Sequence, residues 1–196
     1  MSNSAFQQAI AFVLPHEEEF ARGHWGDERY VITENVPGDS GGLTKYGLDE
    51  AGNPGIDIAS LTRDQAIEIY HHRYWLAHDL DALPTKLAIC AFDVWVNGGH
   101  AIAWLQHAYN IAPSHGDRPF LAEDGLLGPT TLAALASADQ DDVIRIFLEQ
   151  RDARFQALAQ NPARSKFLSG WLQRDRDLAT YLKAITPATP LSLPPA

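Results

Sequence analysis

Residues 29–48, RYVITENVPGDSGGLTKYGL, decide the fold because they alone interrupt a helical pattern that covers the rest of the chain. Arg29–Thr33 and Leu43–Leu48 are short runs with β-branched and aromatic residues, and residues 37–42 between them are dense in turn formers. This pattern predicts a small β-hairpin inserted between helices. We therefore expect a mainly α fold in which the hairpin forms one wall of a cleft.

Helix signals lie on both sides of this segment. Ser4–Gln7 and Thr62–Gln65 have the spacing of capping boxes, and Pro129 suits a first helical turn. Pro15 is expected to end or kink the first helix, or to begin a fresh turn that carries Glu17. The remaining helices are expected over residues 87–96, 100–109, 130–136, 141–158, 165–169 and 172–183.

Composition and charge narrow the class of protein. The chain has 196 residues, 45% of them hydrophobic, which is enough for one domain with a real core. The chain has 15 Lys plus Arg against 25 Asp plus Glu, and these basic residues form no tract. Both observations argue against a nucleic-acid partner. The single cysteine, Cys90, lies in an apolar run and is expected to be a small buried residue rather than a reactive thiol.

Nothing near the N-terminus has the pattern of a signal peptide, and no segment approaches the roughly 18 apolar residues that a membrane span requires. We therefore expect synthesis in a bacterial cytoplasm, no membrane insertion, and action elsewhere only after release or export. A monomer is expected.

Three polar residues around the hairpin could cleave a glycosidic bond. Such cleavage needs one carboxylic acid to protonate the leaving oxygen and a second group to position water or attack the sugar. Glu17, the first of three consecutive glutamates, follows an apolar helix that could raise its pKa, while Asp39 and Thr44 could hold the water. The residues leave open which of the three glutamates faces inward.

Two other chemistries fit the sequence less well. Gly38–Gly42 satisfies the G-x-S-x-G pattern of serine hydrolases, but that motif needs a strand before it and a helix after it. For metals, residues 16–20 lack the second histidine of H-E-x-x-H, and the adjacent His71 and His72 point about 100° apart on a helix. We expect no metal and no cofactor.

Asp93 and Asn97 lie four residues apart on the expected central helix. Two interpretations remain open for this pair: a structural polar network inside the fold, or groove-lining ligands for an acetamido group.

Several motifs in order along the chain resemble glycoside hydrolase family 108, the N-acetylmuramidases common as phage endolysins. The resemblance rests on residues 17–20 and 39–48, then on 69–70, 74–75, 92–99, 104–106, 124–132 and 167–174. It implies a lysozyme-like helical fold, cleavage of the β-1,4 bond after N-acetylmuramic acid, no metal, and the catalytic acid at Glu17. The sequence departs from the family at Glu18 and Glu19, which replace glycines, and in the longer link from Glu17 to Asp39.

The resemblance also suggests how the chain is divided. It implies a catalytic lysozyme-like part over residues 1–96 and a helical peptidoglycan-binding part over 97–185 packed as one unit with it. Residues 186–196 contain four prolines and no polar periodicity, so they are expected to form a Pro-rich tail. Glu17 is expected to protonate the glycosidic oxygen while Asp39 and Thr44 position water. Tyr46, Asp93 and Asn97 are expected to line the saccharide groove.

Three biological settings remain open at this stage. The first is an endolysin that reaches peptidoglycan through a holin-made lesion. The second is a muramidase effector exported by a secretion machine and matched by an immunity protein. The third is a non-catalytic wall-binding or phage structural protein that keeps the fold, for which the substitutions at Glu18 and Glu19 are the best support.

Overall fold

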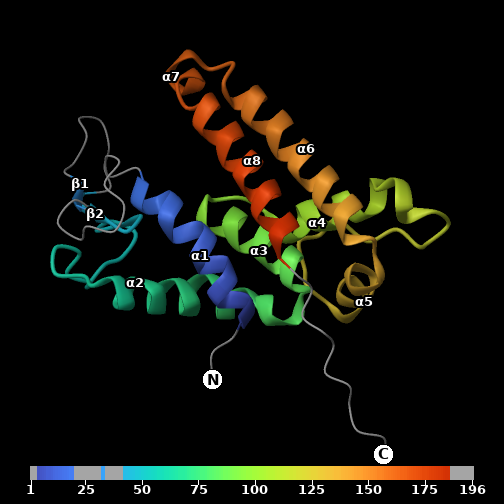
Figure 1. The fold of residues 1–196 in the computed structure, drawn as a ribbon, viewed down its shortest axis with the longest axis horizontal. Helices are drawn as coiled ribbons and strands as arrows, with labels where there is room; N and C mark the ends of the chain where they lie inside the picture. The colour runs from blue at the N-terminus through green and yellow to red at the C-terminus, as the bar shows by residue number, and fades with distance from the viewer. Residues whose placement is uncertain (1–3, 20–31, 34–41, 186–196) are drawn as a thin grey trace, which may run out of the picture. The chain divides into compact units, whose positions relative to one another are not determined.

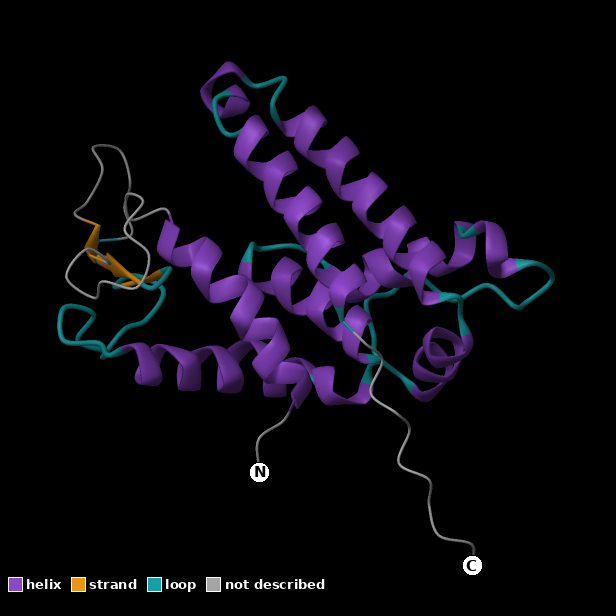
Figure 2. Ribbon diagram, viewed as in Figure 1, coloured by secondary structure: helices purple, strands orange, loops and turns teal. Residues whose placement is uncertain are grey.

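The computed structural model describes residues 4–19, 32–33 and 42–185. Most of these residues are helical, and the strands are confined to one short stretch (Figures 1 and 2). The expected mainly α fold with a small antiparallel sheet is thus confirmed. The chain forms two compact units, Met1–His78 and Asp79–Ala196. The division expected at residues 96 and 97, and the tail expected from 186, remain predictions; the tail lies outside the described residues.

The first unit contains α1 (Ser4–Glu19), β1 (Ile32–Thr33), β2 (Thr44–Lys45), β3 (Leu48–Asp49) and α2 (Arg63–Tyr70), followed by a π-helical turn, His71–Trp75, and a 3₁₀ turn, Leu76–His78. The second unit contains a 3₁₀ turn, Leu80–Ala82, then α3 (Thr85–Val96), α4 (Ala101–Ile111), a 3₁₀ turn, Pro113–His115, and α5 (Pro129–Ser137), α6 (Gln140–Leu158), α7 (Pro162–Ser165) and α8 (Leu168–Ala184). Within the described residues, no helix is both long and apolar enough to cross a membrane.

Helix α1 carries Glu17 because it continues through Pro15 instead of ending there. Proline cannot donate the backbone hydrogen bond to the carbonyl four residues earlier, so its presence in a helix interior normally costs stability. At the next residue, a ring nitrogen of His16 lies 2.8 Å from the carbonyl oxygen of Phe12. At the other end of α1, Phe6 packs its ring 5.5 Å from that of Trp75 in the π-helical turn. Burial of these apolar faces outweighs the local preference for a break.

The β region is a three-stranded antiparallel sheet in the order β1-β2-β3. The pairing of β1 with β2 agrees with the expected hairpin, with Thr33 opposite Thr44. The second expected strand, Leu43–Leu48, is instead split by a tight turn, because Tyr46 and Gly47 both have positive φ, at 53° and 75°. Two consecutive left-handed residues form a type I′ hairpin turn, whose twist matches the twist of the strands that it joins.

Helix α2 holds the sheet in place from outside the hairpin. It begins with the expected capping box: Thr62 accepts a hydrogen bond from the Gln65 backbone, and the Gln65 side chain accepts from the Thr62 backbone. Just beyond its end, Arg73 donates to Asn53 Oδ1 at 2.5 Å, and Asn53 donates to the carbonyl oxygen of Asp49 at 2.8 Å. This chain of hydrogen bonds connects β3 to the helical part of the unit.

The second unit is built around α3, whose residues 87–94 are all buried. This burial on all faces was expected from the nearly continuous apolar sequence. Helices α4 and α6 pack against α3, and α8 lies alongside α6 (Figure 1). The long amphipathic helix expected over 141–158 is confirmed as α6, which Asp139 caps by accepting from the Asp141 and Asp142 backbones.

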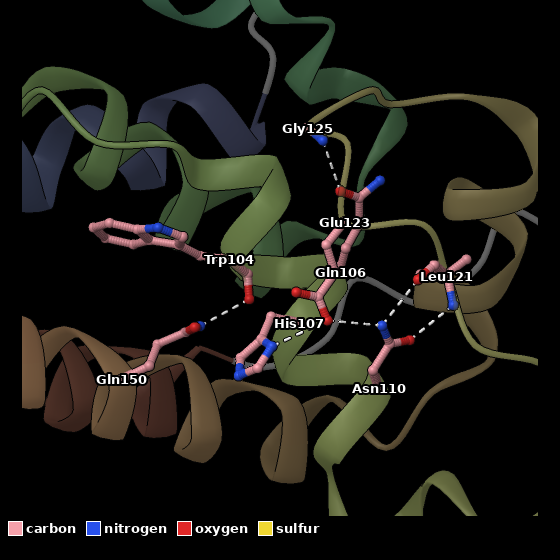
Figure 3. A network of polar contacts seen from close by, with 8 residues as sticks. All are labelled: Trp104, Gln106, His107, Asn110, Leu121, Glu123, Gly125 and Gln150. Atoms are coloured by element: carbon pink, nitrogen blue, oxygen red, sulfur yellow. Dashed lines mark hydrogen bonds and ion pairs between the residues drawn. The ribbon is translucent and has the colours of Figure 1, made fainter.

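A loop of the second unit is fastened to α4 by amide side chains (Figure 3). Asn110 donates to the carbonyl oxygen of Leu121 and accepts from its backbone N–H, at 2.9 and 2.8 Å. Gln106 accepts from the backbone of Gly125 at 2.9 Å, and a His107 ring nitrogen lies 3.0 Å from Glu123 Oε1. These contacts satisfy backbone groups of an irregular segment, so the loop keeps one conformation without strands.

Candidate active site

Glu17 lies against the turn between β2 and β3. A Cβ atom placed on Gly47 would be 2.9 Å from both Cβ and Oε2 of Glu17, so the carboxyl group rests directly on this glycine. Glu17 is half-buried, and its Oε1 is shielded from solvent. A carboxylic acid with one withdrawn oxygen at the edge of a hairpin is suited to hold and deliver a proton.

Gly47 is required at this position for two separate reasons. Its φ of 75° lies in the left-handed region, which side chains other than glycine adopt at a cost. A Cβ there would also lie 2.7 Å from Tyr70 Oη, in addition to its contact with Glu17. The glycine therefore lets the turn approach α1 and α2 closely enough to support the carboxyl group.

Tyr70 stabilises the same turn from α2. Its hydroxyl donates a buried hydrogen bond of 2.9 Å to the carbonyl oxygen of Tyr46. Tyr46 has a φ of 53°, which is unusual for a residue with a bulky side chain, and such a conformation persists where the surroundings hold it. Tyr70 therefore helps to hold the surface on which Glu17 rests.

Tyr74 contributes a second phenol close to this carboxyl group. Burial raises the pKa of Tyr74, and the negative charges of Asp49 and Glu17 raise it further, while Arg73 acts in the opposite direction. Its ring centre is 5.4 Å from that of Tyr70. The phenol therefore keeps its proton and can act as a hydrogen-bond donor near the two carboxylates.

The remaining residues expected around Glu17 have different positions. Asp39 lies outside the described residues. Thr44 begins β2 and is half-buried, opposite Thr33 on one side and Asp49 on the other. Tyr46, expected to line the saccharide groove, has a side chain that is only 1% exposed. The turn therefore presents the backbone around Gly47 to solvent, and the Tyr46 ring belongs to the core.

Asp93 lies in a buried ion-pair network of the second unit. Its Oδ2 accepts a hydrogen bond from Arg151 at 2.8 Å. Its Oδ1 accepts one from Arg174 Nε at 2.9 Å and lies 2.8 Å from Nη2 of the same guanidinium group. Arg151 also pairs with Asp175 at 2.9 Å. With 0% exposure, Asp93 offers no surface to a saccharide. Of the two interpretations left open for this residue, we assign the structural network, in place of the groove-lining role.

The two acids of this network have opposite pKa shifts. Burial acts to raise the pKa of Asp93, but Arg174 and Arg151 together lower it below its usual value. Burial raises the pKa of Asp175 to about 7, with Asp93 and Asp152 adding to the shift and Arg151 opposing it. The difference follows from geometry, because both oxygens of Asp93 face guanidinium groups while Asp175 also faces other acids.

Asn97 is exposed at the end of α3, unlike Asp93. Its Nδ2 donates to the carbonyl oxygen of Asp93 at 2.7 Å, which closes the helix end before Gly98. The side chain also lines a pocket of about 150 Å³ in the second unit, together with residues of α4, α6 and α8. That Asn97 contacts a ligand therefore remains a proposal, and this pocket is where the contact would occur.

The sequence singled out neither Tyr70 as a support for the turn nor the partners of Asp93. For Arg151, the sequence does contain a signal of burial. Val143, Phe147 and Arg151 follow one another at four-residue spacing, so the arginine lies on the buried stripe of α6. A cation in an apolar stripe requires a buried acid, and Asp93, on an otherwise apolar helix, is its counterpart.

Comparison with known proteins gives two family matches in chain order. Residues 30–99 match the family model described as Glycosyl hydrolase 108, and residues 100–176 match the one described as Predicted Peptidoglycan domain. Glu17 precedes the first matched range. No curated protein matches the chain significantly.

A solved structure described as "Structure of Brucella abortus SagA" has the same fold. It superposes with a TM-score of 0.66 at 24% identity, over 93% of this chain and 96% of that one. The likeness extends the fold assignment to nearly the whole chain. In chain order, the first region is similar to glycosyl hydrolase family 108 and the second to a peptidoglycan domain, and together these two matches indicate a peptidoglycan hydrolase.

Proposed function

We propose that this enzyme is an N-acetylmuramidase in which Glu17 is the general acid. The observation that carries the proposal is the close contact of the Glu17 side chain with the turn at Gly47, where one carboxyl oxygen is shielded from solvent. A general acid must be held in a fixed position within hydrogen-bond reach of the oxygen that it protonates, and the turn supports Glu17 in this way. The bond cleaved is the β-1,4 bond between N-acetylmuramic acid and N-acetylglucosamine.

In the proposed reaction, Glu17 transfers its proton to the glycosidic oxygen as the bond from that oxygen to the anomeric carbon breaks. Asp39 and Thr44 hold the water whose oxygen forms the new bond to this carbon, and Asp39 accepts the proton that the water loses. The products are two shorter glycan strands, one with a new reducing N-acetylmuramic acid. The carboxylate of Glu17 regains its proton from solvent before the next turnover.

Tyr70 and Tyr74 act as positioning residues in this proposal. Tyr70 holds the Tyr46 carbonyl, and through it the turn beneath Glu17. Tyr74 offers a protonated phenol in the field of Glu17 and Asp49. Neither takes part in bond breaking, so loss of either hydroxyl should lower the rate without changing the product.

The proposal is tested by hydrolysis of purified Gram-negative peptidoglycan, with the products identified by mass spectrometry. The wild type should release muropeptides that end in reducing N-acetylmuramic acid, and Glu17→Gln should abolish this release. Glu18→Gln and Glu19→Gln are matched controls, because each removes one negative charge next to the proposed acid. Loss of activity in one of these, with Glu17→Gln still active, would move the acid to that residue.

A phage-type lytic role is the setting that we propose for this activity. The two matched regions provide a peptidoglycan-cleaving part and a peptidoglycan-binding part in one chain. The test is expression in the bacterial cytoplasm with and without a holin. Lysis only when the holin is present supports delivery through a membrane lesion. Survival with the holin, together with export by a secretion machine and neutralisation by an immunity protein, would favour an effector.

A further inference from the structure

A small pocket in the second unit combines aromatic walls with a cationic rim. It measures about 150 Å³ and lies where the end of α3 and the start of α4 meet α6 and α8. Its aromatic walls are Trp104, Phe155 and Trp171. Ligand pockets for whole small molecules usually measure roughly 300–1,000 Å³, so this one suits the terminal group of a longer ligand.

The walls of this pocket are held in place by contacts of their own. The rings of Phe155 and Trp171 are stacked, with centres 5.2 Å apart and planes inclined by 25°. On the α4 side, Gln150 of α6 donates a 2.7 Å hydrogen bond to the carbonyl oxygen of Trp104 (Figure 3). A pocket that exists before its ligand arrives loses little conformational entropy on binding.

The charge at the rim distinguishes this pocket from an ordinary packing defect. The guanidinium of Arg154 lies 5.5 Å from the centre of the Trp104 ring and is exposed. No carboxylate in the described ranges lies within ion-pair distance of it, although the chain has a net charge of −10. The second cation lining the pocket, Arg151, is already engaged by Asp93 and Asp175. Arg154 is therefore the cation available to an incoming anion.

We propose that this pocket binds the C-terminal carboxylate of a peptidoglycan peptide stem. Arg154 pairs with the carboxylate in the bidentate geometry that a guanidinium favours. The methyl group of a terminal alanine packs on the aromatic walls. The Oδ1 atom of Asn97, whose Nδ2 is already used by the Asp93 carbonyl, accepts a peptide N–H of the stem.

This inference rests on peptidoglycan as the substrate of the proposed function, but not on Glu17 as its acid. It assigns the second unit a preference for peptide over sugar. The enzyme would then be held on strands that still carry their stems. Strands stripped of stems would be held only by the site that cleaves them.

The test measures binding of a synthetic stem tetrapeptide ending in D-alanine to the full-length chain by calorimetry or NMR titration. The same peptide with a C-terminal amide and an N-acetylglucosamine oligomer are the comparison ligands. Arg154→Gln removes the proposed contact. Arg164→Gln is the matched control, since it makes the same change at an exposed arginine of α7 that does not line the pocket.

The free tetrapeptide should bind, and Arg154→Gln or amidation should each weaken binding by about tenfold to a hundredfold, as expected for loss of a charge-assisted hydrogen bond. Arg164→Gln should leave the affinity unchanged. Equal binding of acid and amide, or no effect of Arg154→Gln, would overturn the proposal. So would sugar-oligomer binding that is lost in Arg154→Gln, because the pocket would then be a saccharide site.

Failure of the two proposals can be told apart. Glu17→Gln should leave tetrapeptide affinity intact, because the peptide does not use the catalytic carboxyl group. An active enzyme that does not bind the tetrapeptide would refute the peptide pocket alone. A chain that binds the tetrapeptide but releases no muropeptides would refute the proposed catalytic function alone.

Discussion

Replacement of Gly47 by alanine should destabilise the first unit and disable the proposed acid together. The left-handed backbone at this position costs about 1–2 kcal/mol for a residue with a Cβ. The new methyl group would also lie 2.9 Å from Glu17 Cβ, which is fixed to α1 and has no freedom to rotate away. Crowding of this kind typically costs about 1–3 kcal/mol. The expected loss of unfolding free energy is therefore about 2–5 kcal/mol.

Gly55→Ala provides the matched control for this substitution. Gly55 has a φ of 86°, so it carries the same backbone penalty, but a Cβ placed on it meets nothing within 4 Å. Its expected loss is about 1–2 kcal/mol, from conformation alone. The difference between the two variants isolates the contact with Glu17 and Tyr70.

The assay pairs urea unfolding with peptidoglycan hydrolysis at a temperature where both variants are folded. Gly55→Ala should keep nearly full activity. Gly47→Ala should lose activity well beyond any change in its folded fraction, because the methyl group displaces the carboxyl group. Equal losses of unfolding free energy in the two variants, or an active Gly47→Ala enzyme, would refute the close contact between Glu17 and Gly47.

Three further predictions concern buried polar groups. Tyr70→Phe should lower the unfolding free energy by about 1–3 kcal/mol and reduce kcat, because it leaves the buried Tyr46 carbonyl without this donor; urea unfolding and product assays check both. Asp93→Asn should lower the unfolding free energy, measured with urea, by about 3–5 kcal/mol, because it removes the charge that faces two buried arginines. Its control is Asp141→Asn, which removes one partner of an exposed ion pair and should cost at most about 1 kcal/mol. The pKa of Asp175 is raised from 3.8 to about 7 on folding, so the native state takes up a proton and stability should fall as pH rises from about 4 to 7. Between pH 5 and pH 8, the unfolding temperature should fall less for Asp175→Asn than for the wild type. An equal fall in both proteins would contradict the raised pKa of Asp175.

Local sequence signals were sufficient for most helices. The capping box at Thr62 and the proline at the first turn of α5 act within a few residues, and the structure confirms both helix starts. The apolar run of α3 predicted complete burial for the same reason, since no face of that helix is compatible with water. The family resemblance, carried by short motifs in order, was likewise available from the sequence and agrees with the matched regions.

Two local predictions were changed by tertiary contacts. Of the alternatives expected at Pro15, the end of the helix does not occur, because packing of α1 on its unit outweighs the one backbone hydrogen bond that proline removes. The segment 43–48 is not a single strand, because Tyr46 adopts a left-handed conformation that its side chain alone would disfavour. Burial of the Tyr46 ring and the hydrogen bond from Tyr70 make that conformation stable, and neither is visible in a local pattern.

The sequence by itself determined the fold class, the start of most helices and the residue types available for glycoside cleavage, since these depend on periodicity, caps and composition within short windows. Only the tertiary structure brought Glu17 onto Gly47 and Asp93 between Arg151 and Arg174. Asp93 and Arg174 are separated by 81 positions. Whether such a carboxylate binds a substrate or closes a buried ion pair depends on which helices meet around it, and that is settled only when the whole core is packed.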